Sequence, residues 1–210
     1  MSNNESFIDE VNEEVRRDQL FGYIRRYGWI AVLAVLILVG AAAWTEYNRS
    51  QERASAQANG DAIIDALSMD NPEDVLAELQ RLPANLVTSM LASSAARETG
   101  DADLAIELLQ GIIDEEGTSE LYKELALLKQ VMVSEGIASA EDRAEKLIPL
   151  TAPGRPFALL AKEQLALAQV EMGDDEAAIA TLKRVLEDAA VTQSLRERSQ
   201  QMIVALGGDL

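Results

Sequence analysis

The sequence predicts an all-α protein in which a single N-terminal transmembrane helix precedes an α-solenoid of antiparallel helix pairs. Three observations support this prediction. One long apolar run carries no charge, apolar residues after it recur with a helical period between glycine and proline breaks, and one helix–turn–helix pattern occurs twice. No segment alternates like a β-strand. The expected parts are a cytoplasmic tail, 1–26, a transmembrane helix, 27–45, a helical stalk with a first helix pair, 46–83, and a repeat domain, 84–210.

The tail is expected to hold a short amphipathic helix at the inner membrane surface. Ser6 precedes Asp9 by three residues, which forms a capping box, and apolar residues follow at helical spacing. A partly disordered tail is the open alternative. Four arginines precede the apolar run and two follow it, a bias that favours a cytoplasmic N-terminus. These topology determinants are Arg16, Arg17, Arg25 and Arg26.

The apolar run has the length of a membrane-spanning helix. Its nineteen residues extend for about 28 Å at ~1.5 Å per residue, close to the ~30 Å hydrocarbon core of a bilayer. A cleaved signal peptide is the alternative, but six acidic residues precede the run, whereas a signal peptide begins with a short basic segment. Aromatic residues that anchor a helix at both membrane interfaces frame the run: Tyr27, Trp29, Trp44 and Tyr47.

Composition excludes several functional classes. The chain has no cysteine and no histidine, which rules out thiol and imidazole nucleophiles, disulfides and the usual zinc, haem and iron–sulfur ligands. After Thr45 there are 30 acids and 14 bases, a net charge of −16, which repels nucleic acid. A glycosidase using two carboxylates is disfavoured because this part has no tryptophan to bind sugars. We therefore expect no enzyme activity, cofactor or metal.

Capping and breaking residues predict the helices in order. The stalk helix is expected to continue to about Leu67. In the second repeat helix, Leu104, Leu108 and Ile112 are predicted to form the apolar stripe. The remaining helices are expected at 71–82, 84–100, 101 onward, 119–133, 139–149, 156–173, 174 onward, and around Leu195, Met202 and Leu206 up to Gly207.

One helix–turn–helix pattern occurs at 93–115 and again at 166–188. Gly100-Asp101 aligns with Gly173-Asp174, where glycine allows a sharp turn and aspartate caps the second helix. The offset of 73 residues is about twice the ~34-residue tetratricopeptide period plus a small insertion. The middle pair, 119–150, lacks this turn and would be a degenerate repeat. The alternative is an unrelated helical bundle with two similar turns.

In the order of its parts the chain resembles the tetratricopeptide-like ancillary subunits of the bacterial SecYEG translocon. The resemblance rests on the charged tail, the membrane helix ending in Trp44 and Tyr47, the polar helix 52–58, the turn at Gly173-Asp174 and the closing helix 195–206. It implies an inner-membrane scaffold with a periplasmic C-terminal domain that assists newly exported proteins. The implied partners are SecYEG translocon subunits, a membrane-anchored parvulin-type periplasmic chaperone and exported client polypeptides.

The same repeat is similar to that of periplasmic cell-division coordinators, so an envelope-assembly or cell-division adaptor is the alternative function. In a tetratricopeptide solenoid the first helix of each pair lines a groove, here expected to be mixed apolar and acidic. The alternative is that Met90, Leu160 and Leu167 are core residues, as Tyr122 and Phe157 are expected to be. The predicted groove residues are Val87, Met90, Ser94, Arg97 and Glu98 in one repeat and Leu160, Glu163, Leu167, Val170 and Glu171 in the other.

Overall fold

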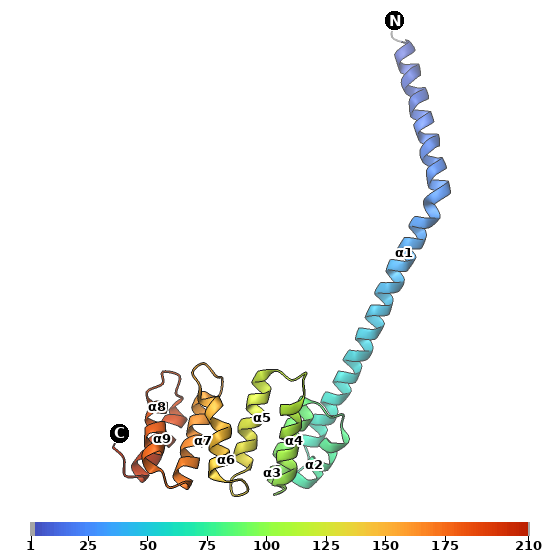
Figure 1. The fold of residues 1–210 in the computed structure, drawn as a ribbon. Helices are drawn as coiled ribbons and strands as arrows, with labels where there is room; N and C mark the ends of the chain where they lie inside the picture. The colour runs from blue at the N-terminus through green and yellow to red at the C-terminus, as the bar shows by residue number, and fades with distance from the viewer. Residues whose placement is uncertain (1–2, 210) are drawn as a thin grey trace. The chain divides into compact units, whose positions relative to one another are not determined.

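The computed structural model describes the backbone of residues 3–209 and the side-chain surroundings of residues 26, 29–30 and 32–209. Over this part of the chain all regular structure is helical, which confirms the all-α prediction (Figure 1). The helices are α1 (Asn3–Leu67), α2 (Pro72–Arg81), α3 (Leu86–Glu98), α4 (Ala102–Asp114), α5 (Glu120–Val133), α6 (Ala140–Leu147), the 3₁₀ turn η1 (Ile148–Thr151), α7 (Ala158–Glu171), α8 (Asp175–Leu186) and α9 (Gln193–Ala205).

Helix α1 ends at Leu67, where the sequence predicted. The chain divides into two compact units, Met1–Ala58 and Asn59–Leu210. In the first unit the described apolar side chains of α1 are exposed, with Leu36 at 62% and Leu38 at 70%. Trp29, Trp44 and Tyr47 are likewise exposed.

Among the residues for which the structure gives a placement, no helix combines the length and the apolarity that crossing a membrane requires. The predicted span includes Tyr27, Gly28 and Ala31, which lie outside the described side chains. The capping box at 6–9 and the topology determinants Arg16, Arg17 and Arg25 also lie outside them, whereas Arg26 is described and exposed.

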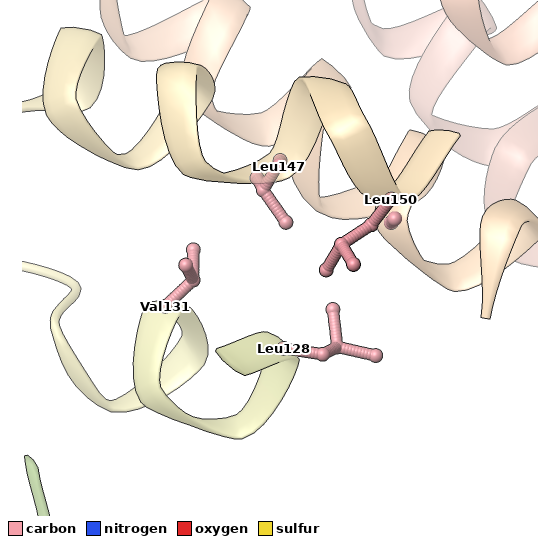
Figure 2. Packing of buried hydrophobic residues seen from close by; sticks show 5 residues of the cluster. Leu128, Val131, Leu147 and Leu150 are labelled. Carbon is pink, nitrogen blue, oxygen red and sulfur yellow. The ribbon is translucent and has the colours of Figure 1, made fainter. Parts of the chain in front are cut away.

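In the second unit, helices α2 to α9 stand side by side in chain order, each packed mainly on its neighbours (Figure 1). The buried residues form separate clusters between successive helices, as expected when each repeat contacts only the adjacent ones. Leu128 and Val131 of α5, for example, face Leu147 of α6 and Leu150 of η1 (Figure 2). The other clusters centre on Leu79 with Ala92, on Leu109 with Ile112, and on Leu182 with Ile203. This is the packing of an α-solenoid.

The two predicted glycine-aspartate turns have the same geometry. Gly100 and Gly173 have φ angles of 82° and 78°, in the left-handed region that glycine enters without steric cost. The amide of Asp101 donates to the Ala96 carbonyl at 2.8 Å, and that of Asp174 makes the equivalent 2.9 Å bond. Each aspartate side chain then caps the next helix. The internal repeat is therefore present in three dimensions as well as in the sequence.

This geometry predicts opposite effects for two glycine substitutions. Gly173→Ala should lower the free energy of unfolding by about 1–2 kcal/mol, because an L-residue is strained at this positive φ. Gly111→Ala should raise it by up to about 1 kcal/mol, because Gly111 lies inside α4 and an added Cβ would meet no atom within 4 Å. Urea unfolding followed by circular dichroism measures both. Equal effects of the two substitutions would contradict the turn assignment.

Some sequence predictions were wrong in detail. Helix α3 begins at Leu86 rather than Ala84, because the Asn85 side chain accepts from the amides of Val87 and Thr88 and so caps the helix. In α4 the predicted Leu104 and Leu108 are only half-buried. Ile112 is buried as predicted, and the other fully buried residues of α4 are Ala105 and Leu109, which neighbour the predicted stripe.

Three further details differ. The helix expected from Pro156 begins two residues later, at Ala158. The middle pair has its own turn, in which Gly136 takes a φ of 77°. Tyr122, expected in the core, is 43% exposed, because it lies on the first turn of α5, whereas Phe157 packs partly buried against the α5–α6 cluster.

Candidate functional site

An apolar pocket of about 410 Å³ lies between α5, α7 and α9. These are the first helices of successive pairs, together with the closing helix. Three predicted groove residues of α7, namely Leu160, Glu163 and Leu167, line it. We call the surface formed by α3, α5, α7 and α9 the groove face. The full lining is Leu128, Met132, Leu160, Glu163, Gln164, Leu167, Arg198 and Met202.

The one acid that lines this pocket, Glu163, forms an ion pair with an arginine. Glu163 is buried, and Arg198 of α9 binds both of its carboxylate oxygens, through Nε at 2.7 Å and through Nη2 at 2.9 Å. This two-point contact, followed by the carboxylate charge, raises the pKa of Arg198 above its ordinary value. The Glu163–Arg198 pair connects α7 to α9. Apart from this ion pair and Gln164, the lining of the pocket is apolar.

At the α3–α5 end of the groove face, a lysine binds a hydroxyl group instead of a carboxylate. Lys129 of α5 donates from Nζ to the Ser94 hydroxyl of α3 at 2.8 Å. Burial, and then the positive charge of Arg97, lower the pKa of Lys129 below its ordinary value. A hydroxyl group of α3 and an ammonium group of α5 are thus in contact at this place.

The remaining predicted groove residues do not share one surface. Met90 packs partly buried on the cluster of Leu109 and Ile112, and Val170 packs on that of Leu182, so both contribute to the core. Glu171 binds Arg143 of α6 instead of facing an open groove. Val87, Arg97 and Glu98 are exposed on α3. The structure therefore brings Leu160, Glu163 and Leu167 together at one pocket and places Met90 and Val170 against core clusters.

The expected acidic character of the groove is also wrong at the pocket. Glu163 and Glu171 both bind arginines. Arg97 and Lys129, like Lys123, Lys162 and Arg196 on the same set of helices, take part in no ion pair within the described range. At the pocket, the one acid of the lining is therefore paired with an arginine, in a domain with a net charge of −16.

Buried ion pairs between repeats were not found by sequence reasoning. Arg143 of α6 is buried and binds Glu171 of α7, and Glu124 of α5 is buried and binds Arg155, which precedes α7. Partners in these pairs are 28 and 31 residues apart. No local sequence signal identifies pairs at such distances. Among the described residues, no group of three or more acids is arranged to hold a metal ion.

Comparison with protein families matches residues 161–189 to the tetratricopeptide repeat. The matched segment covers most of α7 and all of α8, including the Gly173-Asp174 turn and three of the four α7 residues that line the pocket. No curated protein and no solved structure matches the chain. The match supports a tetratricopeptide-type protein, whose repeats serve as protein-interaction scaffolds.

Proposed function

We propose that this protein is a membrane-anchored interaction scaffold that associates with the Sec translocon and with a membrane-anchored parvulin-type chaperone, and so assists newly exported polypeptides. The observation that carries the proposal is the apolar pocket on the groove face of the tetratricopeptide-type repeats. Such a pocket suits apolar side chains of a polypeptide that has not yet buried them. The order of the parts along the sequence resembles that of translocon ancillary subunits. This resemblance supports the Sec translocon as the complex to which the protein binds.

The anchor in this proposal is the helix over 27–45, with the tail in the cytoplasm and the repeats in the periplasm. Contiguous apolar side chains along α1, among them Leu36 and Leu38, are exposed in the first unit, and an apolar surface of this kind needs an apolar environment. The arginine bias around the run supports the orientation. The small residues 40–43 would let a neighbouring membrane helix approach closely.

The host complex can be identified with photoreactive amino acids at Leu36 and Ala42 of the full-length protein in native membranes. Crosslinked partners are then identified by mass spectrometry. We expect translocon subunits at one or both positions, with a matched probe at the exposed Gln51 of the stalk giving fewer of them. Recovery of division or peptidoglycan-synthesis proteins without translocon subunits would overturn the translocon assignment and favour an adaptor for that complex.

A further inference from the structure

The second unit begins with the last part of α1, residues 59–67, which forms the N-terminal end of the helix stack. Ala66 of this segment is fully buried and packs with Leu79 of α2 and Ala92 of α3. Because the unit begins here, it has no earlier helix to cover the other side of the segment. One face of residues 59–67 is therefore packed on the stack, and the opposite face is open.

Large apolar side chains gather at this open face. Ile64 is 66% exposed, more than any other large apolar side chain described in the second unit, and Leu67 and Met69 are exposed as well. At about 100° per residue, Ile64 points away from the buried Ala66, and Leu67 is its neighbour on the helix surface. We call Ile64, Leu67 and Met69 the N-terminal patch. Exposed apolar groups that lie together favour contact with a partner.

The opposite end of the stack has a different surface. Helix α9 exposes Gln193, Glu197 and Gln201 in one stripe, and Val204 is the large apolar side chain that it exposes. A helical solenoid needs a polar outer face on its terminal repeats to remain soluble. Most exposed positions of α9 meet this requirement, whereas the N-terminal patch does not. The N-terminal end is therefore the end suited to receive another helix.

The rim of the N-terminal patch is acidic. Asp61, Asp65 and Asp70 are exposed beside it, and no lysine or arginine occurs from residue 54 to residue 80. Acidic residues alone do not distinguish this place, because residues 98–120 also lack a base. That stretch, however, exposes no large apolar side chain. The combination of exposed apolar groups with an acidic rim therefore distinguishes the N-terminal end from the acidic surface of α4.

We propose that the N-terminal patch and its acidic rim bind a basic amphipathic helix of a partner protein, which adds to the stack as one more helix. The apolar stripe of the partner helix covers Ile64 and Leu67, and its lysines and arginines lie over Asp61 and Asp65. Residues 59–67 extend for about 13 Å, so a partner helix of about nine residues matches them in length. The proposal goes beyond the proposed function, because these residues do not line the pocket of α5, α7 and α9.

Charge decides between this occupant and the alternatives. A second copy of the chain related by two-fold symmetry would bring the acidic rim against itself, and like charges at close range repel each other. The same acids repel anionic lipid head groups. A basic helix is instead attracted by the rim, because its charges come within the distance of about 8 Å over which salt leaves electrostatic interactions effective.

The test uses the full-length protein in nanodiscs of zwitterionic lipid, with photoreactive benzoylphenylalanine at Leu67 so that this position stays apolar. The probe is a fluorescent helical peptide with leucines at every third or fourth position and lysines between them. One control peptide has glutamate in place of each lysine, and another has the same residues in scrambled order. Only peptide that contacts the labelled position is crosslinked, so peptide bound to lipid is not counted.

A matched photoreactive residue at Ile148, an exposed apolar position of η1, reports non-specific contact. We expect the basic amphipathic peptide to crosslink at Leu67 about fivefold more than at Ile148. It should also crosslink there more than either control peptide, with a yield that falls as salt rises.

The contribution of the rim is tested by Asp61→Asn/Asp65→Asn/Asp70→Asn, which should lower the yield at Leu67 about fivefold because the attracting charges are removed. The matched control Asp103→Asn/Glu107→Gln/Glu116→Gln removes three exposed acids on and just after α4, and it should leave the yield unchanged.

Circular dichroism of each variant checks that the helices are intact. Equal yields at Leu67 and Ile148, or equal yields of the basic and the acidic peptide, would overturn the proposal. Crosslinks at Leu67 to a second copy of the chain or to lipid in place of the peptide would overturn it as well, and so would equal effects of the two triple variants. None of these outcomes alters the crosslinks expected at Leu36 and Ala42, so this proposal and the proposed function fail separately.

Discussion

Leu182→Ala is expected to lower the free energy of unfolding by about 2–5 kcal/mol, because it removes a fully buried side chain and leaves a cavity. Leu182 of α8 has no exposed surface and packs with Ala166 of α7 and Ile203 of α9. It therefore joins three helices of the stack. Urea unfolding of the full-length protein, followed by circular dichroism, measures the change. Circular dichroism is preferred to tryptophan fluorescence because both tryptophans lie in α1.

The matched control for this prediction is Leu121→Ala. Leu121 is 45% exposed on the first turn of α5, so the same chemical change should alter the free energy of unfolding by no more than about 0.5 kcal/mol. Equal losses at the two positions would show that the α7–α8–α9 cluster is not the core assigned here.

Two arginines in the apolar run should release the protein from membranes. Replacing an apolar residue by arginine near the centre of a membrane helix costs about 3–4 kcal/mol, so Leu36→Arg/Leu38→Arg should cost roughly twice that. Alkaline carbonate extraction followed by ultracentrifugation measures the distribution between pellet and supernatant. We expect the unchanged protein in the membrane pellet and the arginine variant mainly in the supernatant.

The control for the arginine variant is Leu36→Ala/Leu38→Ala, which shortens the same side chains without adding charge and should stay in the pellet. An unchanged protein that is extracted by carbonate would contradict the anchor. So would an arginine variant that fractionates like the unchanged protein, because a spanning helix does not tolerate two central charges at so little cost.

Sequence reasoning located the helices and the turns well because their signals are local. A glycine before an aspartate at Gly100-Asp101 and Gly173-Asp174 determines both a left-handed turn and a helix cap within a few residues. The start of α3 was misplaced because the capping role of Asn85 was not recognised. Asn85 caps the helix, since its side chain and that of Thr88 bond each other's backbone amides.

The candidate site was only partly predictable, because helix faces depend on what packs against them. Periodicity put Leu160 and Leu167 on the helix face that lines the pocket, but it could not show that Met90 and Val170 turn toward the core. In α4, Ala105 and Leu109 are more deeply buried than the predicted Leu104 and Leu108 for the same reason. Adjacent residues point about 100° apart on a helix, and only the neighbouring helices decide which of them is buried.

The charge of the groove could not be predicted from the sequence. Glu163 is one acid among many in the chain, and its partner Arg198 is 35 residues away on α9. The same separation of 35 residues divides Ser94 from Lys129. Contacts at this distance depend on how successive repeats stack. The Ser94–Lys129 and Glu163–Arg198 contacts therefore became visible only with the three-dimensional structure.

The central claim is that the groove face, and specifically the pocket of α5, α7 and α9, binds polypeptides. The most direct measurement places a photoreactive amino acid at Leu160, which lines the pocket and is 42% exposed. A matched probe at Ala180 occupies an exposed position of α8 that does not line the pocket. In native membranes we predict polypeptide crosslinks at Leu160 well above those at Ala180. Equal crosslinking at both positions, or none at Leu160, would contradict the account.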